Sequence, residues 1–258
     1  MFREIPNLLT LGNLACGLLG INFLVNYNPY TGSDSLIYAL ILMGIAGVLD
    51  FFDGFTARLL KVDGEMGKQL DSLADLVTFG VLPGLIWKKF MDITGACPPS
   101  GFCINQYVWL LIPLAAAYRL AKFNISTDQK VNFKGIPTPI TGLVLASWVL
   151  LFDGISSEGL SYSQIQSNSD WTFYKTLTNF YVMLYMPLLS SYLMVSDLDM
   201  LSFKFNKSDE LNAYRMVLLV ILLGLGIMNY RYALPLFYIV YIIISQVSFT
   251  VVNRKNHE

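Results

Sequence analysis

The sequence is short of the residues from which many active sites are built. Its one histidine, His257, stands beside the C-terminus, which excludes a Ser-His-Asp site and argues against a histidine-built zinc site. Three cysteines are too few for a metal cluster. The segment from Gly64 to Lys68 has the wrong spacing for a P-loop, and no serine or threonine follows its lysine.

Charge is scarce as well. Charged residues make up 14% of the 258 residues, whereas soluble domains usually carry about a quarter. Hydrophobic residues make up 55%, and the mean hydropathy is +0.54. A net charge of −1 gives no basis for nucleic-acid binding. The composition therefore predicts a polytopic membrane protein.

Apolar runs separated by polar loops predict an all-α bundle of about eight transmembrane helices in a single membrane domain, residues 1–258. Residues 1–195 would form a core of six spans, and residues 211–252 would add two more. The predicted spans are Leu8–Val25, Leu36–Phe52 (continuing past Arg58), Gly67–Trp87, Tyr107–Leu120, Pro137–Phe152, Phe180–Val195, Leu211–Met228 and Tyr232–Val252.

Lysine and arginine set the expected orientation. Eight spans place both termini on one side of the membrane, and thirteen of the basic residues fall on that side against four on the other. Because cytoplasmic loops carry the excess of lysine and arginine, we expect the termini to face the cytoplasm. The membrane would be a bacterial inner membrane.

The functional signal is a set of four aspartates between two apolar runs. Carboxylates at membrane depth are costly, so such a cluster indicates a functional site. Their spacing puts them on one face of each of two successive helices, with Asp50, Asp53 and Ala57 on the first and Gly67, Asp71 and Asp75 on the second. If the two helices are antiparallel, all four carboxylates point into one space.

Four carboxylates in one space repel each other unless cations neutralise them. Hard divalent cations prefer oxygen ligands, and two of them would balance the charge. Gly54 and Gly67 leave room for a bulky group, and the Arg58 guanidinium can hold a phosphate. These parts predict two-metal phosphoryl chemistry with Mg²⁺ or Mn²⁺.

The pattern Asp50-x2-Asp53-Gly54-x2-Ala57-Arg58-x8-Gly67-x3-Asp71-x3-Asp75 resembles the signature of the CDP-alcohol phosphotransferase family at every fixed position. The resemblance implies a CDP-linked lipid donor, an alcohol acceptor and release of CMP. It implies that Asp75 is the general base, in addition to any contact with metal. The residues expected to bind the CDP-lipid are Asn7, Thr10, Asp53, Gly54, Ala57, Arg58 and Gly67.

Two further stretches, IPNLLTLGNLACGLLGI at 5–21 and RLAKFN at 119–124 followed by FKGIPTP at 133–139, resemble the phosphatidylserine synthase branch. The implied substrates are CDP-diacylglycerol and L-serine. The serine carboxylate needs a cation, for which Arg119 and Lys134 are the candidates, and Asn124 could accept a hydrogen bond from the ammonium.

Alternatives stay open at this point. Glycerol 3-phosphate or inositol phosphate could replace serine, because the same cations would bind a phosphate. A cation transporter could also use intramembrane aspartates, although it has no need of Gly54, Ala57, Arg58 and Gly67 at fixed offsets. Thr10 and Asn13 could face the nucleotide or only pack within the first helix. A homodimer is possible.

Cys97 and Cys103 lie in a predicted non-cytoplasmic loop, CPPSGFC, whose prolines and glycine favour a turn. An oxidising compartment would permit a disulfide between them. Two free thiols are the alternative.

Overall fold

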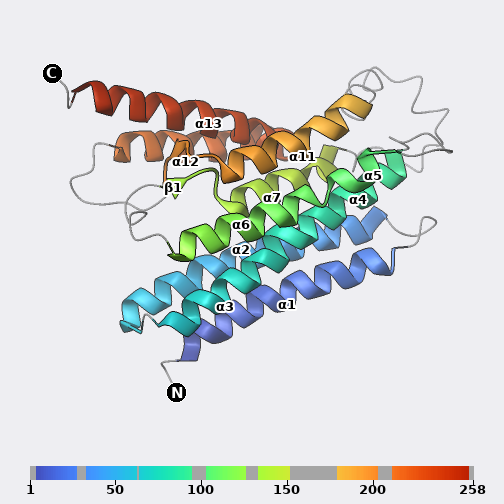
Figure 1. Cartoon of the computed structure of the whole chain (residues 1–258), viewed down its shortest axis with the longest axis horizontal. Helices are drawn as coiled ribbons and strands as arrows, with labels where there is room; N and C mark the ends of the chain where they lie inside the picture. Colours follow the sequence, from blue (N-terminus) through green and yellow to red (C-terminus); the bar gives the residue numbers. More distant parts are fainter. Residues whose placement is uncertain are drawn as a thin grey trace.

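A computed structural model describes residues 4–27, 33–62, 64–94, 103–125, 133–151, 179–202 and 211–255. Within these ranges the chain is a bundle of helices that run side by side, and the only strands are two residues long. Figure 1 shows the first three helices on one side of the bundle and α12 and α13 on the opposite side, with α6, α7 and α11 between them.

Helix α1 (Ile5–Val25) starts one turn before the predicted span, because Pro6 suits the first turn of a helix. Helix α2 (Ser33–Leu60) packs along α1, and both are apolar. On α1, two glycines allow close approach of the third span, which contains Thr78 and Leu82. A Cβ at Gly17 would lie 2.5 Å from Thr78 Oγ1, and one at Gly20 would lie 2.7 Å from Leu82 Cδ2. These contacts fix how α1 is rotated.

The third span has three parts. Helix α3 (Glu65–Asp75) is followed directly by a π-helical segment, η2 (Leu76–Val81), and then by α4 (Leu82–Thr94). π-helical turns are rare and frequently lie at functional sites. Here the segment begins at the residue after Asp75, and its Thr78 hydroxyl donates to the Asn13 carbonyl oxygen at 3.2 Å.

The remaining spans follow the predicted order with adjusted ends. A short α5 (Asn105–Val108) precedes α6 (Leu111–Ile125), and α7 (Thr138–Ser147) ends in a 3-10 turn, η3 (Trp148–Leu151). Helix α11 (Phe180–Val195) has the predicted bounds, and α12 (Asn212–Met228) nearly so. Helix α13 (Tyr230–Lys255) is longer than predicted at both ends.

Two segments predicted to be polar connections contain a small antiparallel ribbon. Strand β1 (Phe133–Lys134) pairs with β2 (Asp199–Met200), with Phe133 opposite Met200 and Lys134 opposite Asp199. The ribbon joins the start of α7 to the segment after α11.

Apolar side chains pack in two main clusters on either side of α7. One lies between α2, η2, α4 and the end of α7, around Met43, Phe79 and Leu82. The other lies between α7, α11, α12 and α13, around Ile136 and Tyr241. Many large apolar side chains on the outer faces are exposed, as expected for helices that face lipid.

The prediction of an all-α, polytopic membrane bundle is confirmed. In the described part of the chain five helices are long and apolar enough to cross a membrane: Ile5–Val25, Ser35–Leu60, Glu65–Asp92, Asn105–Ile125 and Tyr230–Val252. The other three predicted spans correspond to shorter apolar helices, which are Thr138–Leu150, Phe180–Val195 and Asn212–Met228.

The cysteines are in two states. Cys103 is disulfide-bonded and Cys16 is a free thiol. Cys97, the predicted partner of Cys103, lies outside the described residues.

Candidate functional site

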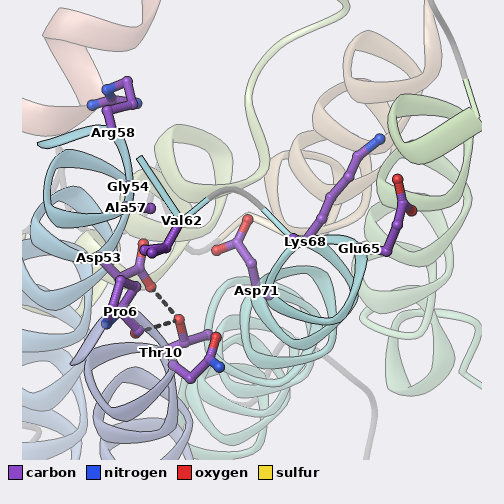
Figure 2. Close-up of a pocket in the computed structure, with 13 residues that line it drawn as sticks. Pro6, Thr10, Asp53, Gly54, Ala57, Arg58, Val62, Glu65, Lys68 and Asp71 are labelled. Atoms are coloured by element: carbon purple, nitrogen blue, oxygen red, sulfur yellow. Dashed lines mark hydrogen bonds between the residues drawn. The ribbon is translucent and has the colours of Figure 1, made fainter. Parts of the chain in front are cut away.

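A cavity of about 660 Å³ opens where α1 begins, α2 ends and α3 begins. Its walls come from these three helices and the turn between α2 and α3, as Figure 2 shows. The lining residues are Pro6, Asn7, Thr10, Asp53, Gly54, Ala57, Arg58, Val62, Gly64, Glu65, Gly67, Lys68 and Asp71. All seven residues predicted to bind the CDP-lipid are among them, although their roles stay predictions.

Three of the four aspartates lie close together beside this cavity, and two of them, Asp53 and Asp71, line it. One carboxylate oxygen from each of Asp50, Asp53 and Asp71 lies within 4.8 Å of the other two. Figure 2 shows Asp53 and Asp71 facing each other from α2 and α3. The facing-helix arrangement that the spacing predicted is therefore present, and it gathers carboxylates whose negative charge bound cations can balance.

Asp75 is buried next to these three aspartates. It is 7% exposed, does not line the cavity, and lies beside Asp50. The amide Nδ2 of Asn13 donates to Asp75 Oδ1 at 3.3 Å, and Asn13 is itself fully buried. The sequence left Asn13 with two alternatives, facing the nucleotide or packing within the first helix, and did not predict a contact with Asp75, because the direction of its side chain depends on how α1 is rotated.

Helix α1 also holds Asp53. The Thr10 hydroxyl lies 2.6 Å from Asp53 Oδ2 and 3.0 Å from the Pro6 carbonyl oxygen, so its one proton has two acceptors. Figure 2 draws both contacts. Thr10 thus contacts its own helix, as one of its two alternatives predicted, and contacts Asp53 as well; that it faces the nucleotide stays a prediction. Contacts from α1 thus orient two of the four aspartates.

The two glycines of the motif differ in what surrounds them. A Cβ at Gly67 would lie 3.3 Å from Asn7 Oδ1, so this glycine lets α3 approach α1. A Cβ at Gly54 would meet only the Arg58 guanidinium at 3.5 Å, so Gly54 leaves open space in the cavity. Arg58 is exposed at the rim and makes no ion pair within the described chain. It is therefore able to bind an anion.

The three residues predicted to bind serine lie outside the cavity lining. Arg119 on α6 is 8% exposed, donates from Nη1 to Thr138 Oγ1 at 3.1 Å, and interacts electrostatically with Asp75. Lys134 makes a 2.7 Å ion pair with Asp199 across the ribbon. The structure therefore brings Arg119 toward the aspartates, whereas Lys134 is held by another partner.

Asn124 connects α6 to α3. Its Nδ2 donates to Ser72 Oγ at 2.8 Å, and its backbone oxygen accepts from Lys68 Nζ at 2.7 Å. Its Oδ1 is buried and has no hydrogen-bond partner in the described part of the chain. A buried acceptor of this kind suits the ammonium group for which Asn124 was predicted.

Comparison with known families gives a match over most of the chain. The model of the CDP-alcohol phosphatidyltransferase family matches residues 3–194. This range contains the cavity, all four aspartates and the three residues predicted to bind serine. It ends before α12 and α13.

Several curated proteins are similar in sequence. A CDP-diacylglycerol–serine O-phosphatidyltransferase of Bacillus subtilis is 36% identical over 167 residues, which is 62% of this chain and 86% of that protein. An archaetidylserine synthase of Methanothermobacter thermautotrophicus is 34% identical over 153 residues, covering 58% of this chain and 59% of the relative. A Helicobacter pylori protein named like the first is 34% identical over 148 residues, 57% of each chain. The match thus spans most of the Bacillus protein but less than two thirds of the other two.

Proposed function

Because the chain belongs to the CDP-alcohol phosphatidyltransferase family, we propose that it transfers the phosphatidyl group of CDP-diacylglycerol to the hydroxyl of L-serine. The products are phosphatidylserine and CMP. The observation that carries the choice of serine is the similarity to the Bacillus subtilis serine O-phosphatidyltransferase, which extends over 86% of that relative. The same family match favours an enzyme over the cation transporter.

The cavity supports the donor half of this proposal. It opens between α1, α2 and α3 and is lined by the guanidinium of Arg58 at its rim and by the carboxylates of Asp53 and Asp71. The diphosphate would enter between them, with the acyl chains in the bilayer. The space beside Gly54 and the hydroxyl of Thr10 suit a nucleotide, which needs room and polar contacts together.

The carboxylates fit divalent cations, which the family requires. The oxygens of Asp50, Asp53 and Asp71 are within 4.8 Å of one another and form an all-oxygen donor set of the kind that Mg²⁺ and Mn²⁺ prefer. Two ions, with Asp75 as a further ligand, are our proposal. Bound there, they would offset the charge of the diphosphate and of the departing CMP.

Transfer then needs one bond to form and one to break. The serine hydroxyl oxygen attacks the phosphorus that carries diacylglycerol, the bond from that phosphorus to the CMP oxygen breaks, and the hydroxyl proton passes to the Asp75 carboxylate. Asp75 suits this role because it is buried beside Asp50, and Asn13 holds one of its oxygens. Arg119 would bind the serine carboxylate, with Asn124 on the ammonium and Lys134 in support.

We also propose in which membrane, and on which side of it, the reaction takes place. The chain would lie in a bacterial inner membrane with the cavity facing the cytoplasm, where CDP-lipid and serine are both accessible. Residues 1–195 would form the catalytic core of six spans, with residues 211–252 added to it in the same domain. A homodimer is compatible with this arrangement.

The test is acceptor choice by the purified enzyme. CDP-diacylglycerol is presented in mixed micelles with Mg²⁺, and labelled serine, glycerol 3-phosphate and inositol phosphate are offered separately and in competition. We expect labelled lipid and equimolar CMP with serine, and neither product from an Asp75→Asn variant. A lipid product from glycerol 3-phosphate or inositol phosphate in preference to serine would refute the serine assignment, and absence of CMP with all three would refute the transferase.

A further inference from the structure

Helix α13 lies beyond the part of the chain that the family model matches, yet one of its faces holds a segment near the site. Tyr241 is fully buried, and its hydroxyl donates to the Leu201 carbonyl oxygen at 2.8 Å. One turn later, Ser245 Oγ accepts from the Leu201 backbone N–H at 3.4 Å, and Gln246 Nε2 donates to the Asp199 carbonyl oxygen at 3.0 Å. Three side chains of α13 therefore bind the backbone of β2 and the residue after it.

Strand β2 in turn holds β1 and the start of α7. The Gly135 N–H donates to the Leu198 carbonyl oxygen at 2.9 Å, and the Ile136 N–H donates to the Leu193 carbonyl oxygen at 3.1 Å. Gly135 has φ of +71°, and a Cβ there would lie 2.2 Å from the Met194 carbonyl oxygen, so only glycine fits. The ribbon is locked to the end of α11 by its backbone.

Two ion pairs add side-chain contacts around the same ribbon. Lys134 pairs with Asp199 at 2.7 Å in the cross-strand position, and Lys122 of α6 pairs with Asp197 at 2.7 Å. The hydrogen bond from Lys122, together with its charge, lowers the pKa of Asp197, which keeps this carboxyl ionised. The ribbon is thus tied to α6 as well as to α13.

The ribbon leads directly to the acceptor side of the site. Four residues after Lys134, α7 begins at Thr138, which is fully buried and accepts the hydrogen bond of Arg119. Arg119 also lies close to both Asp75 and Tyr241. A displacement of β2 would therefore move the start of α7 and change the direction of the Arg119 guanidinium.

We propose that Tyr241 and Gln246 of α13 are positioning residues for acceptor binding, which act through the β1–β2 ribbon and Thr138 on Arg119. This inference rests on the proposed function, because it takes Arg119 to bind the acceptor. It assigns to the C-terminal pair of spans a part in substrate selection, although neither residue touches the acceptor. Donor binding, which uses α1, α2 and α3, should be independent of it.

The experiment compares Tyr241→Phe and Gln246→Leu with a matched control, Tyr238→Phe. Tyr238 lies one turn away on the same helix and is also buried, at 4% exposed. Its hydroxyl lies near Thr141 and Ser190 and has no hydrogen-bond partner in the described part of the chain. Each variant is purified as the full chain, and KM is measured for the acceptor that the parent enzyme uses and for CDP-diacylglycerol. A double variant, Tyr241→Phe with Arg119→Lys, tests whether Tyr241 acts through Arg119.

We expect Tyr241→Phe and Gln246→Leu each to raise the acceptor KM by about tenfold, the effect of losing a buried hydrogen bond. The KM for CDP-diacylglycerol should stay at the parent value, and Tyr238→Phe should change neither. Combined with Arg119→Lys, Tyr241→Phe should add little, because both changes affect the same contact.

Three results would overturn the proposal: an unchanged acceptor KM in both α13 variants, an equal rise in both KM values, or multiplicative effects in the double variant. An equal rise would indicate a purely structural role. The acceptor that the parent enzyme uses is determined first. If that acceptor is not serine, the serine assignment is wrong, whereas the positioning role of α13 is tested separately by the KM values of the variants.

Discussion

At the scale of single residues, the carboxylate of Asp71 can be neutralised without changing the shape of its side chain. Asp71→Asn removes one oxygen anion from the three that lie within 4.8 Å of one another. We expect the rate of CMP release to fall at least about a hundredfold at limiting Mg²⁺, since even residues that only support a metal ligand contribute ten- to a hundredfold.

The matched control is Asp92→Asn. Asp92 forms an exposed ion pair with Lys88 at the far end of the same span, so its loss should leave the rate unchanged. The measurement is the initial rate against Mg²⁺ concentration, together with gel-filtration behaviour of each variant. Parent-like rates for Asp71→Asn across the titration would exclude Asp71 as a metal ligand.

Asn13 gives a second prediction at this scale. Asn13→Leu keeps the volume but removes the amide that donates to Asp75, so we expect kcat to fall about tenfold with little change in either KM. Asn22→Leu, on an exposed part of the same helix, is the control and should be neutral. Equal kcat in the two variants would show that Asn13 does not position Asp75.

The aspartates could be predicted from the sequence, whereas Asn13 could not. Spacing within one helix decides which side chains share a face, so the meeting of Asp50, Asp53 and Asp71 follows from their positions. The rotation of α1 against the third span depends instead on contacts between distant residues, such as Gly17 with Thr78. No pattern within residues 5–25 contains that information.

At the scale of elements, the end of α2 carries a local strain. Lys61 has φ of +54°, and the hydrogen bonds from Lys61 N to the Arg58 oxygen and from Val62 N to the Ala57 oxygen form a Schellman cap, in which glycine is favoured. Lys61→Gly should therefore stabilise the protein by about 0.5–1 kcal/mol. The left-handed conformation costs a residue with a side chain about 1–2 kcal/mol, and the greater entropy of glycine in the unfolded chain offsets part of the gain from removing that cost.

Thermal unfolding in one detergent, followed by tryptophan fluorescence, measures this effect. Lys61→Ala is the control, because alanine loses the charge but keeps the Cβ that causes the strain. A midpoint that rises equally in the two variants would mean that the lysine charge, and not the backbone conformation, is responsible.

Helices were easier to predict than the ribbon for a physical reason. Long apolar runs can only be buried in lipid or in each other, so the spans follow from hydropathy, and only their ends shift with capping and packing. Strands β1 and β2 have two residues each, too few to show an alternation. Their pairing comes from contacts with α11 and α13, which are far away in sequence.

At the scale of the whole molecule, the basic residues predict which end faces the cytoplasm. Glu65 is exposed at the start of α3, beside the cavity, and Lys88 near the end of α4 has a side chain that is 41% exposed. In whole cells, Lys88→Cys should react with a membrane-impermeant maleimide, and Glu65→Cys should react only after permeabilisation. The opposite pattern would reverse the orientation, and the parent enzyme measures the background from its own cysteines.

The π-helical segment Leu76–Val81 sets the angular phase between the two halves of the third span. In a plain α-helix, the stretch from Asp71 to Phe90 would turn roughly 100° past five full turns. The wider π turn absorbs about one residue with little added rotation. On either side of it, Asp71 lines the cavity and Phe90, 3% exposed, packs in the apolar core. Deleting one residue of this segment would leave a stretch that a plain α-helix turns through about five full turns, so the span could lose its π turn and still keep its two halves in phase.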